Sequence, residues 1–285
     1  MDGLQASHNC NRSRCSSITC CVFILERKEG EEMSLRETLL DLSRNLFSYV
    51  NQVRADPNSS KIVGYHSGDT SRIADREIET FIIDYFNKKT DLKIKFVTEE
   101  SGVIDRSNSD YIAVIDPLDG SSNFVMGIPW YSVSIALYER ESKSMRNSVA
   151  GIIMNLTTGK AYSYDKKRAY MDGSPALDTP RVVLAYYDVD QVAQAKEIME
   201  KVEKPFKVRT LGSASLDMSL VCEGRASLYF DIRSKLRNVD IAASTNFCIK
   251  MGFSVISQEG KPLDSSIENV ERIKDWVITS KSLES

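Results

Sequence analysis

The sequence predicts a protein of mixed α+β and α/β structure, with an N-terminal α+β half and a smaller C-terminal α/β half. Apolar residues recur at helical spacing over residues 34–53, which indicates a core-facing helix. Strand-like runs between residues 131 and 171 are separated by short loops, which favours an antiparallel N-terminal sheet. Beyond Pro180 the predicted strands and helices alternate, which is typical of an α/β arrangement.

Composition excludes several classes of protein. The chain has 285 residues, of which 42% are hydrophobic, so it can form one large domain or two small ones. A formal net charge of −3 with mixed signs gives no overall field that would attract nucleic acid or an anionic membrane. No apolar stretch approaches the length of a transmembrane helix. We therefore expect a cytoplasmic protein that binds a small molecule, and neither nucleic acid nor membrane.

Residues 1–32 differ from the rest of the chain. They are polar and cysteine-rich, and we expect a disordered leader or a misassigned translation start without a chemical role. Four of the six cysteines crowd this leader, so we predict no disulfide framework. Cys222 and Cys248 lie in apolar helix-like sequence, where each is expected to be a small buried hydrophobe. The predicted halves are therefore residues 33–179 and 180–285.

A second amphipathic helix is predicted after Asp75, which would lie near its start. An acid there is favoured by the helix dipole without any further role. Residues 94–99 alternate as a strand does and deliver Glu99 and Glu100 to its end. Consecutive strand residues face opposite sides, so one of these two glutamates can easily join a site and the other is a bystander.

The stretch from Tyr111 to Phe124 is the most informative. Its β-branched run predicts a buried strand, and Asp116 followed by Pro117 then suggests an N-cap with proline at the first helical position. Asp116 and Asp119 would then share one face of the first helical turn. Two carboxylates so close repel each other and are stable as anions only with a cation between them. Mg²⁺ is the natural candidate. The alternative is that both acids only stabilise the helix start.

The C-terminal half alternates between predicted strands and helices. A helix closed by Gly224 follows Ala214, and another begins after Asp240 and is stopped by Gly252. Strands are predicted at 181–186, 207–210, 226–230, 253–257 and 276–279. As a plain N-cap of the later helix, Asp240 would need no metal.

The segment DPLDGSSNF at 116–124, followed by GIPWYSVSIAL, resembles the metal-binding signature of the inositol monophosphatase family. The resemblance includes FVTEESG upstream and the segment from RTLGSASLDMSL to NVDIAAS downstream, and so runs from about Met33 to the end. The most similar version is the archaeal-type fructose-1,6-bisphosphatase/inositol-1-monophosphatase. The family implies a layered α-β-α-β-α sandwich of the sugar-phosphatase type, and a homodimer or homotetramer.

The resemblance also implies roles for individual residues. Two or three Mg²⁺ ions, with Mn²⁺ as a substitute, would be held by Glu99, Asp116, the carbonyl of Leu118, Asp119 and Asp240. Asp75 and Ser121 would activate the attacking water. The substrate would contact the backbone of Gly120 and Ser121, together with Ser213, Ala214, Asp231 and Arg233. Val239 departs from the family pattern, which has tryptophan or proline before the last aspartate, so the match at Asp240 is looser.

The implied activity is Mg²⁺-dependent hydrolysis of phosphate monoesters, with fructose 1,6-bisphosphate or inositol 1-phosphate as substrate. Two alternatives stay open. A nucleotide 3′-phosphatase shares the same metal-binding core, and a metal-stabilised regulatory protein without catalysis would keep the fold. The presence of every acid expected for metal and water favours an enzyme.

Overall fold

The computed structural model describes residues 33–66, 69–105, 108–178 and 180–281. The predicted leader at 1–32 therefore lies outside the described residues. Met33–Ser285 form one compact unit. Within the described ranges, no helix is both long enough and apolar enough to cross a membrane.

Helices account for much of the described chain. They are α1 (Leu35–Ala55), α2 (Ile73–Lys89), α3 (Ser121–Met126), α4 (Val192–Met199), α5 (Ala214–Cys222) and α6 (Asn238–Lys250), with a short 3-10 turn η1 (Val189–Gln191) before α4. The predicted first helix is confirmed. It begins with a capping box in which the Ser34 and Glu37 side chains satisfy each other's backbone N–H groups.

The large sheet has seven strands in the order β4-β3-β5-β6-β7-β8-β9. These are β3 (Ile94–Thr98), β4 (Gly102–Ile104), β5 (Tyr111–Asp119), β6 (Ser132–Glu139), β7 (Ala150–Asn155), β8 (Ala161–Tyr164) and β9 (Ala169–Met171). The predicted meander from β6 to β9 is confirmed as antiparallel.

The small sheet has five strands in the order β11-β10-β12-β14-β13, all from residues beyond Pro180. Its members are β10 (Val182–Tyr186), β11 (Lys207–Arg209), β12 (Leu228–Asp231), β13 (Phe253–Ile256) and β14 (Val277–Lys281). A separate hairpin pairs β1 (Ile62–His66) with β2 (Asp69–Arg72), immediately before α2.

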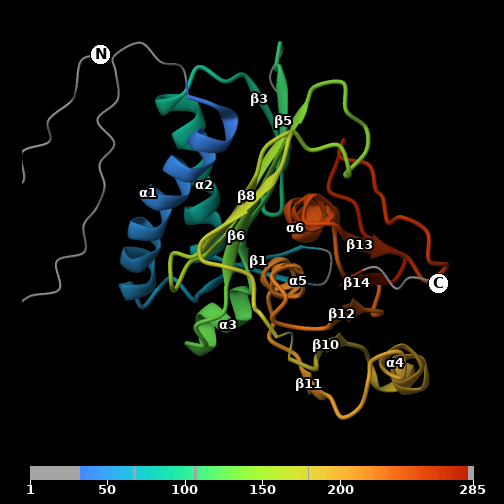
Figure 1. Ribbon diagram of the computed structural model, residues 1–285. Helices are drawn as coiled ribbons and strands as arrows, with labels where there is room; N and C mark the ends of the chain where they lie inside the picture. The colour runs from blue at the N-terminus through green and yellow to red at the C-terminus, as the bar shows by residue number, and fades with distance from the viewer. Residues whose placement is uncertain (1–32, 67–68, 106–107, 179, 282–285) are drawn as a thin grey trace, which may run out of the picture. The chain divides into compact units, whose positions relative to one another are not determined.

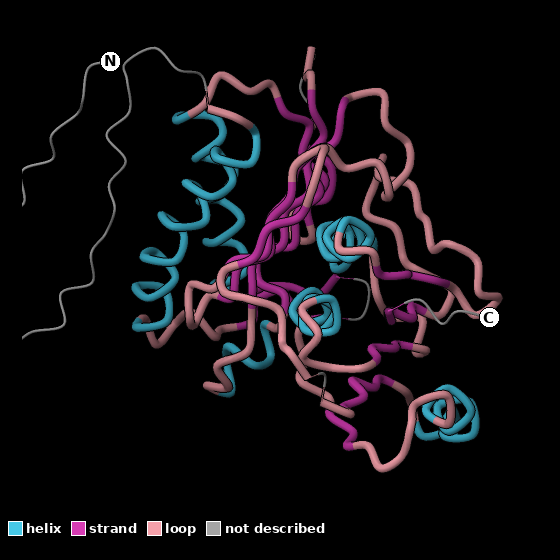
Figure 2. Tube along the Cα trace, in the orientation of Figure 1, coloured by secondary structure: helices cyan, strands magenta, loops and turns pink. Residues whose placement is uncertain are grey.

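The elements of this unit stack in five layers, which confirms the predicted α-β-α-β-α sandwich (Figures 1 and 2). Helices α1 and α2 pack on one face of the large sheet through an apolar cluster that contains Leu42 and Ile78. Helices α5 and α6 lie between the two sheets, where Val239 and Phe247 join the largest cluster. Helix α4 packs on the outer face of the small sheet.

Two expectations about the large sheet need correction. The predicted antiparallel N-terminal sheet contains one parallel pair, β3 with β5. The helix predicted to begin at Pro117 is wrong, because β5 continues to Asp119 and α3 begins at Ser121. The four residues of β5 from Asp116 to Asp119 oppose three of β6, so the strand is bulged there. A bulge is one of the few places in a sheet that accept proline.

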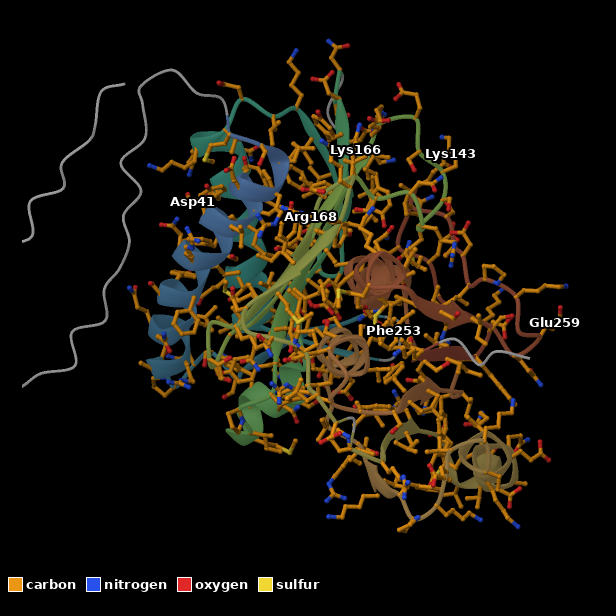
Figure 3. All side chains as sticks on the ribbon, in the orientation of Figure 1. Asp41, Lys143, Lys166, Arg168, Phe253 and Glu259 are labelled. Carbon is orange, nitrogen blue, oxygen red and sulfur yellow. A yellow bond between two sulfur atoms is a disulfide. The ribbon has the colours of Figure 1, made fainter. Side chains whose placement is uncertain are left out.

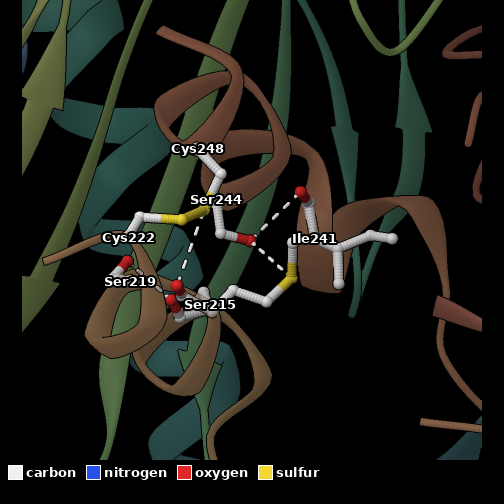
Figure 4. The surroundings of a disulfide bond; sticks show 7 residues. Ser215, Ser219, Cys222, Ile241, Ser244 and Cys248 are labelled. Carbon is white, nitrogen blue, oxygen red and sulfur yellow. Dashed lines mark hydrogen bonds between the residues drawn. A yellow bond between two sulfur atoms is a disulfide. The ribbon is translucent and has the colours of Figure 1, made fainter. Parts of the chain in front are cut away.

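The expectation for the two body cysteines also needs correction. Cys222 and Cys248 are buried as predicted, but they form a disulfide that joins α5 to α6 (Figure 4). Ser244 of α6 also donates to the sulfur of Met218 on α5, so the two helices are linked by both contacts. The pairing was missed because a separation of 26 residues gives no local signal of contact.

Candidate metal centre

Three carboxylates from different elements form a compact group. Glu99, Asp116 and Asp240 each offer an oxygen, and these oxygens lie within 4.8 Å of one another. Asp116 and Asp240 are buried, and Glu99 is half-buried. Three converging carboxylates suit a hard cation such as Mg²⁺, which prefers oxygen ligands.

The parallel strand pair brings two of these acids together. Thr98 of β3 is in register with Ile115 of β5, so the next residues, Glu99 and Asp116, emerge side by side. They share the sheet face of Val97 and Val114, which belong to the cluster that also contains Val239 of α6. Packing of α6 on this face then delivers Asp240 from its first turn.

The electrostatics of the group favour a bound cation. Burial raises the pKa of Asp116 well above its usual range, and the charges of Glu99, Asp119 and Asp240 raise it further. Burial also raises the pKa of Asp240 to about 7. A cation among the carboxylates would favour their ionised forms and reverse both effects.

Arg237 is a member of this group that the sequence analysis missed. Its guanidinium Nη2 contacts Glu99 Oε1 and lies 3.2 Å from Asp240 Oδ1. Its backbone N–H also donates to Asp240 Oδ2 at 2.8 Å. The sequence does place this arginine three residues before an acid at a predicted helix start. That spacing usually indicates only a surface ion pair, so it did not identify Arg237 as part of the site.

Asp75 lies close to the carboxylate group. It is buried in the first turn of α2, and its Oδ2 accepts from the backbone N–H of Arg72 at 2.8 Å. Burial raises its pKa to about 8, and the charges of Glu99 and Glu100 act in the same direction. Glu100 itself is directed elsewhere, because its Oε2 accepts from Ser71 and lies 3.8 Å from Arg76 Nε.

Asp119 is outside the group of three in this structure. Its carboxylate accepts hydrogen bonds from Ser132 Oγ, Ser213 Oγ, Ala214 N, and both N and Oγ of Ser215. Ser213 and Ala214, which were expected to line the substrate pocket, therefore contact Asp119. These bonds join the end of β5 to the start of α5, while the charge of Asp119 still raises the pKa of Asp116.

The end of β5, Gly120 and the start of α3 hold three further predicted residues. The backbone N–H of Leu118 donates to Asp116 Oδ1 at 3.0 Å. Gly120 has a φ of 95°, and a Cβ at this position would lie 3.0 Å from the carbonyl oxygen of Trp130. Glycine is therefore required here by both conformation and space. Ser121 is the first residue of α3.

A second set of buried polar groups, also missed from sequence, holds the segment before α5. The Tyr186 hydroxyl donates to Asp217 Oδ2 at 2.5 Å and accepts from the backbone N–H of Leu211 at 3.0 Å. Trp130 Nε1 donates to Asp217 Oδ1 at 2.8 Å. Burial raises the pKa of Asp217 to about 7. These bonds position the segment that binds Asp119.

The last two predicted substrate-binding residues contact each other. Arg233 Nη2 lies 2.6 Å from Asp231 Oδ2, and the guanidinium carbon lies 4.8 Å from the centre of the Tyr186 ring. Asp231 is buried at the end of β12. Because Tyr186 also holds the Leu211 backbone, this pair borders the segment that contacts Asp119.

Comparison with known proteins places these features in context. Residues 33–275 match the Inositol monophosphatase family. An inositol-1-monophosphatase from Aeropyrum pernix is 29% identical over 248 residues, which cover 84% of this chain and 90% of the relative. A fructose-1,6-bisphosphatase/inositol-1-monophosphatase from Methanocaldococcus jannaschii is 30% identical over 232 residues, which cover 79% of this chain and 87% of the relative. A solved structure titled as an inositol monophosphatase-fructose 1,6 bisphosphatase superposes with a TM-score of 0.73 at 28% identity, covering 88% of this chain and 96% of that one.

Proposed function

The chain belongs to the inositol monophosphatase family, whose members are sugar and inositol phosphate monoesterases, and on that premise we propose a Mg²⁺-dependent phosphatase. Its substrates would be fructose 1,6-bisphosphate, inositol 1-phosphate or both. The relatives described above carry one or both of these activities in their names.

The convergence of Glu99, Asp116 and Asp240 supports this proposal most directly. A buried group of ionised acids raises the free energy of the folded state unless a counter-charge neutralises it, and such groups are typical of functional sites. Arg237 supplies one positive charge but contacts only Glu99 and Asp240 of the three. The donor set therefore fits one or more Mg²⁺ ions, to which we add Asp119 and the carbonyl of Leu118 as ligands.

The remaining residues would position water and substrate. Bound Mg²⁺ would neutralise phosphate oxygens and lower the pKa of water. The Arg72 backbone N–H donates to Asp75 Oδ2, so Oδ1 would be the oxygen that accepts a proton from the attacking water. Ser121 would orient the same water. The backbone N–H groups of Gly120 and Ser121 would donate to the phosphate.

The sugar or inositol ring would lie between this phosphate site and Asp231. A bisphosphate carries a second dianion away from the metal centre, and Arg233 is the cation beside Asp231 that can bind it. Pairing with Asp231 fixes the position of the guanidinium, while 28% of the Arg233 side chain stays exposed.

A phosphate-release assay tests the proposal. We expect hydrolysis of inositol 1-phosphate or fructose 1,6-bisphosphate in Mg²⁺ and none in EDTA. Release only from a 3′-phosphorylated nucleotide would assign the alternative enzyme class. No release from any of these substrates by folded protein in Mg²⁺ would leave the regulatory alternative.

A further inference from the structure

A cavity of about 470 Å³ lies on the outer face of the small sheet. One wall comes from the end of α4 and the residues after it, and the floor comes from β12, β14 and β13. In Figure 1 these strands lie between α6 and α4, on the side of the molecule that α4 occupies. The lining contains no residue of the carboxylate group and includes Arg181, Ile198, Lys201, Leu228, Ile256 and Ser280.

The floor of the cavity is apolar. Leu228 pairs with Ser280 and Phe230 with Ile278 across β12 and β14, so these four residues share one face of the sheet. This is the outer face, because Phe230 and Ile278 pack with Ile198 of α4, whereas Tyr229 and Val277 face α5 and α6. A ligand with an apolar body fits such a floor.

Ser280 adds an unmet polar group to this floor. The residue is 4% exposed, and its Oγ has no hydrogen-bond partner among the residues the structure describes. Ser280 lies on the same sheet face as Ile278 and is one of the residues that line the cavity, but its Oγ atom is covered by protein.

The rim carries an excess of positive charge. Arg181, Lys201 and Lys281 line the cavity together with a single acid, Glu203. Glu203 Oε1 is 2.8 Å from Arg181 Nη2, so this acid is already paired. The two lysines leave a formal charge of +2 at the rim. The opposite edge is formed by the turn after β13, where Gln258 and Gly260 face the cavity and Glu259 lies at the outer edge (Figure 3).

We propose that this cavity binds a small amphipathic anion, with its apolar body on the floor and a carboxylate or phosphate group at Lys201 and Lys281. The volume lies within the range of roughly 300–1,000 Å³ that is usual for small-molecule sites. The site is separate from the carboxylate group and does not depend on the proposed activity.

The test uses binding rather than turnover. The fluorescent probe 8-anilinonaphthalene-1-sulfonate combines an apolar body with an anion, and we expect saturable binding with a stoichiometry of about one. Octanoate or octyl phosphate should displace the probe, and the more effective of the two identifies the anionic group. Octanol at equal concentration should displace it poorly.

Two variants locate the site. Lys201→Glu combined with Lys281→Glu should weaken probe binding by about tenfold or more, because both rim cations are replaced by acids. Val202→Trp, on the cavity wall, should block binding while circular dichroism shows a folded protein. The matched control Lys207→Glu changes an exposed lysine of β11 outside the cavity and should leave binding unchanged.

Unchanged probe binding in both cavity variants would overturn the proposal. So would a wild-type dimer in sedimentation that Val202→Trp converts to monomer, because a second copy of the chain would then cover this face.

Discussion

The thermal stability of the metal-free protein should fall as pH rises from 6 to 7. Burial raises the pKa of Asp75 from 3.8 to about 8, and that of Asp217 from 3.8 to about 7. Between pH 4 and pH 8 the folded protein therefore binds more protons than the unfolded chain. The free energy of unfolding must then decrease as pH increases through this window.

The contribution of Asp75 gives the minimum size of the effect. Between pH 6 and pH 7 the Asp75 carboxyl stays protonated in the folded state and ionised in the unfolded state. The free energy of unfolding therefore falls by about 1.4 kcal/mol over this pH unit. For a chain of this size the loss corresponds to roughly 2–4 °C in Tm. Asp116, Asp217 and Asp240 act in the same direction, because burial raises the pKa of each.

Thermal unfolding followed by circular dichroism in EDTA measures the effect. Mg²⁺ should raise Tm more at pH 7 than at pH 6, because a bound cation favours the ionised carboxylates. Asp75→Asn should reduce the fall in the free energy of unfolding between pH 6 and pH 7 by about 1.4 kcal/mol. The control Asp91→Asn replaces an exposed acid before β3 and should leave this fall unchanged. A Tm in EDTA that is constant or rises between pH 6 and pH 7 would refute the reasoning.

Three further predictions concern other parts of the molecule. Arg233→Ala should raise KM for fructose 1,6-bisphosphate by about tenfold to a hundredfold, with much less effect on inositol 1-phosphate; equal losses in steady-state kinetics would mean that Arg233 acts through Asp231. Reduction of the Cys222–Cys248 disulfide should lower stability by roughly 2–4 kcal/mol in denaturant unfolding, given its 26-residue separation, and an unchanged midpoint after confirmed reduction would contradict this. A chain that begins at Met33 should keep the Tm and turnover of the full chain, because Met33–Ser285 form a compact unit; a large fall in Tm would exclude this.

Local patterns were sufficient for much of the fold and for part of the site. Leu39, Leu42 and Leu46 recur at helical spacing, so α1 and its buried face could be predicted. The alternation that ends in Glu99 and Glu100 predicted that only one would join the site, and Glu99 is that residue. Both predictions depend on a period within one element, which the sequence displays directly.

Features that depend on pairing between distant segments were missed. The continuation of β5 past Pro117 depends on a bulge against β6, and no property of residues 116–119 alone reveals that register. Arg237 joins the carboxylate group because α6 packs beside the ends of β3 and β5. The contact between Trp130 and Asp217 spans 87 residues, and although both residues lie in segments that resemble the family, no local pattern indicates that they pair.

The most direct test of the proposed metal centre is Mg²⁺-dependent phosphate release by Asp116→Asn. This change removes the negative charge of the buried central carboxylate while keeping its shape. At saturating Mg²⁺ we expect turnover to fall by at least about a hundredfold. The matched variant Asp91→Asn should retain wild-type turnover. If folded Asp116→Asn protein keeps more than about a tenth of wild-type turnover, the carboxylate group is not the catalytic metal site.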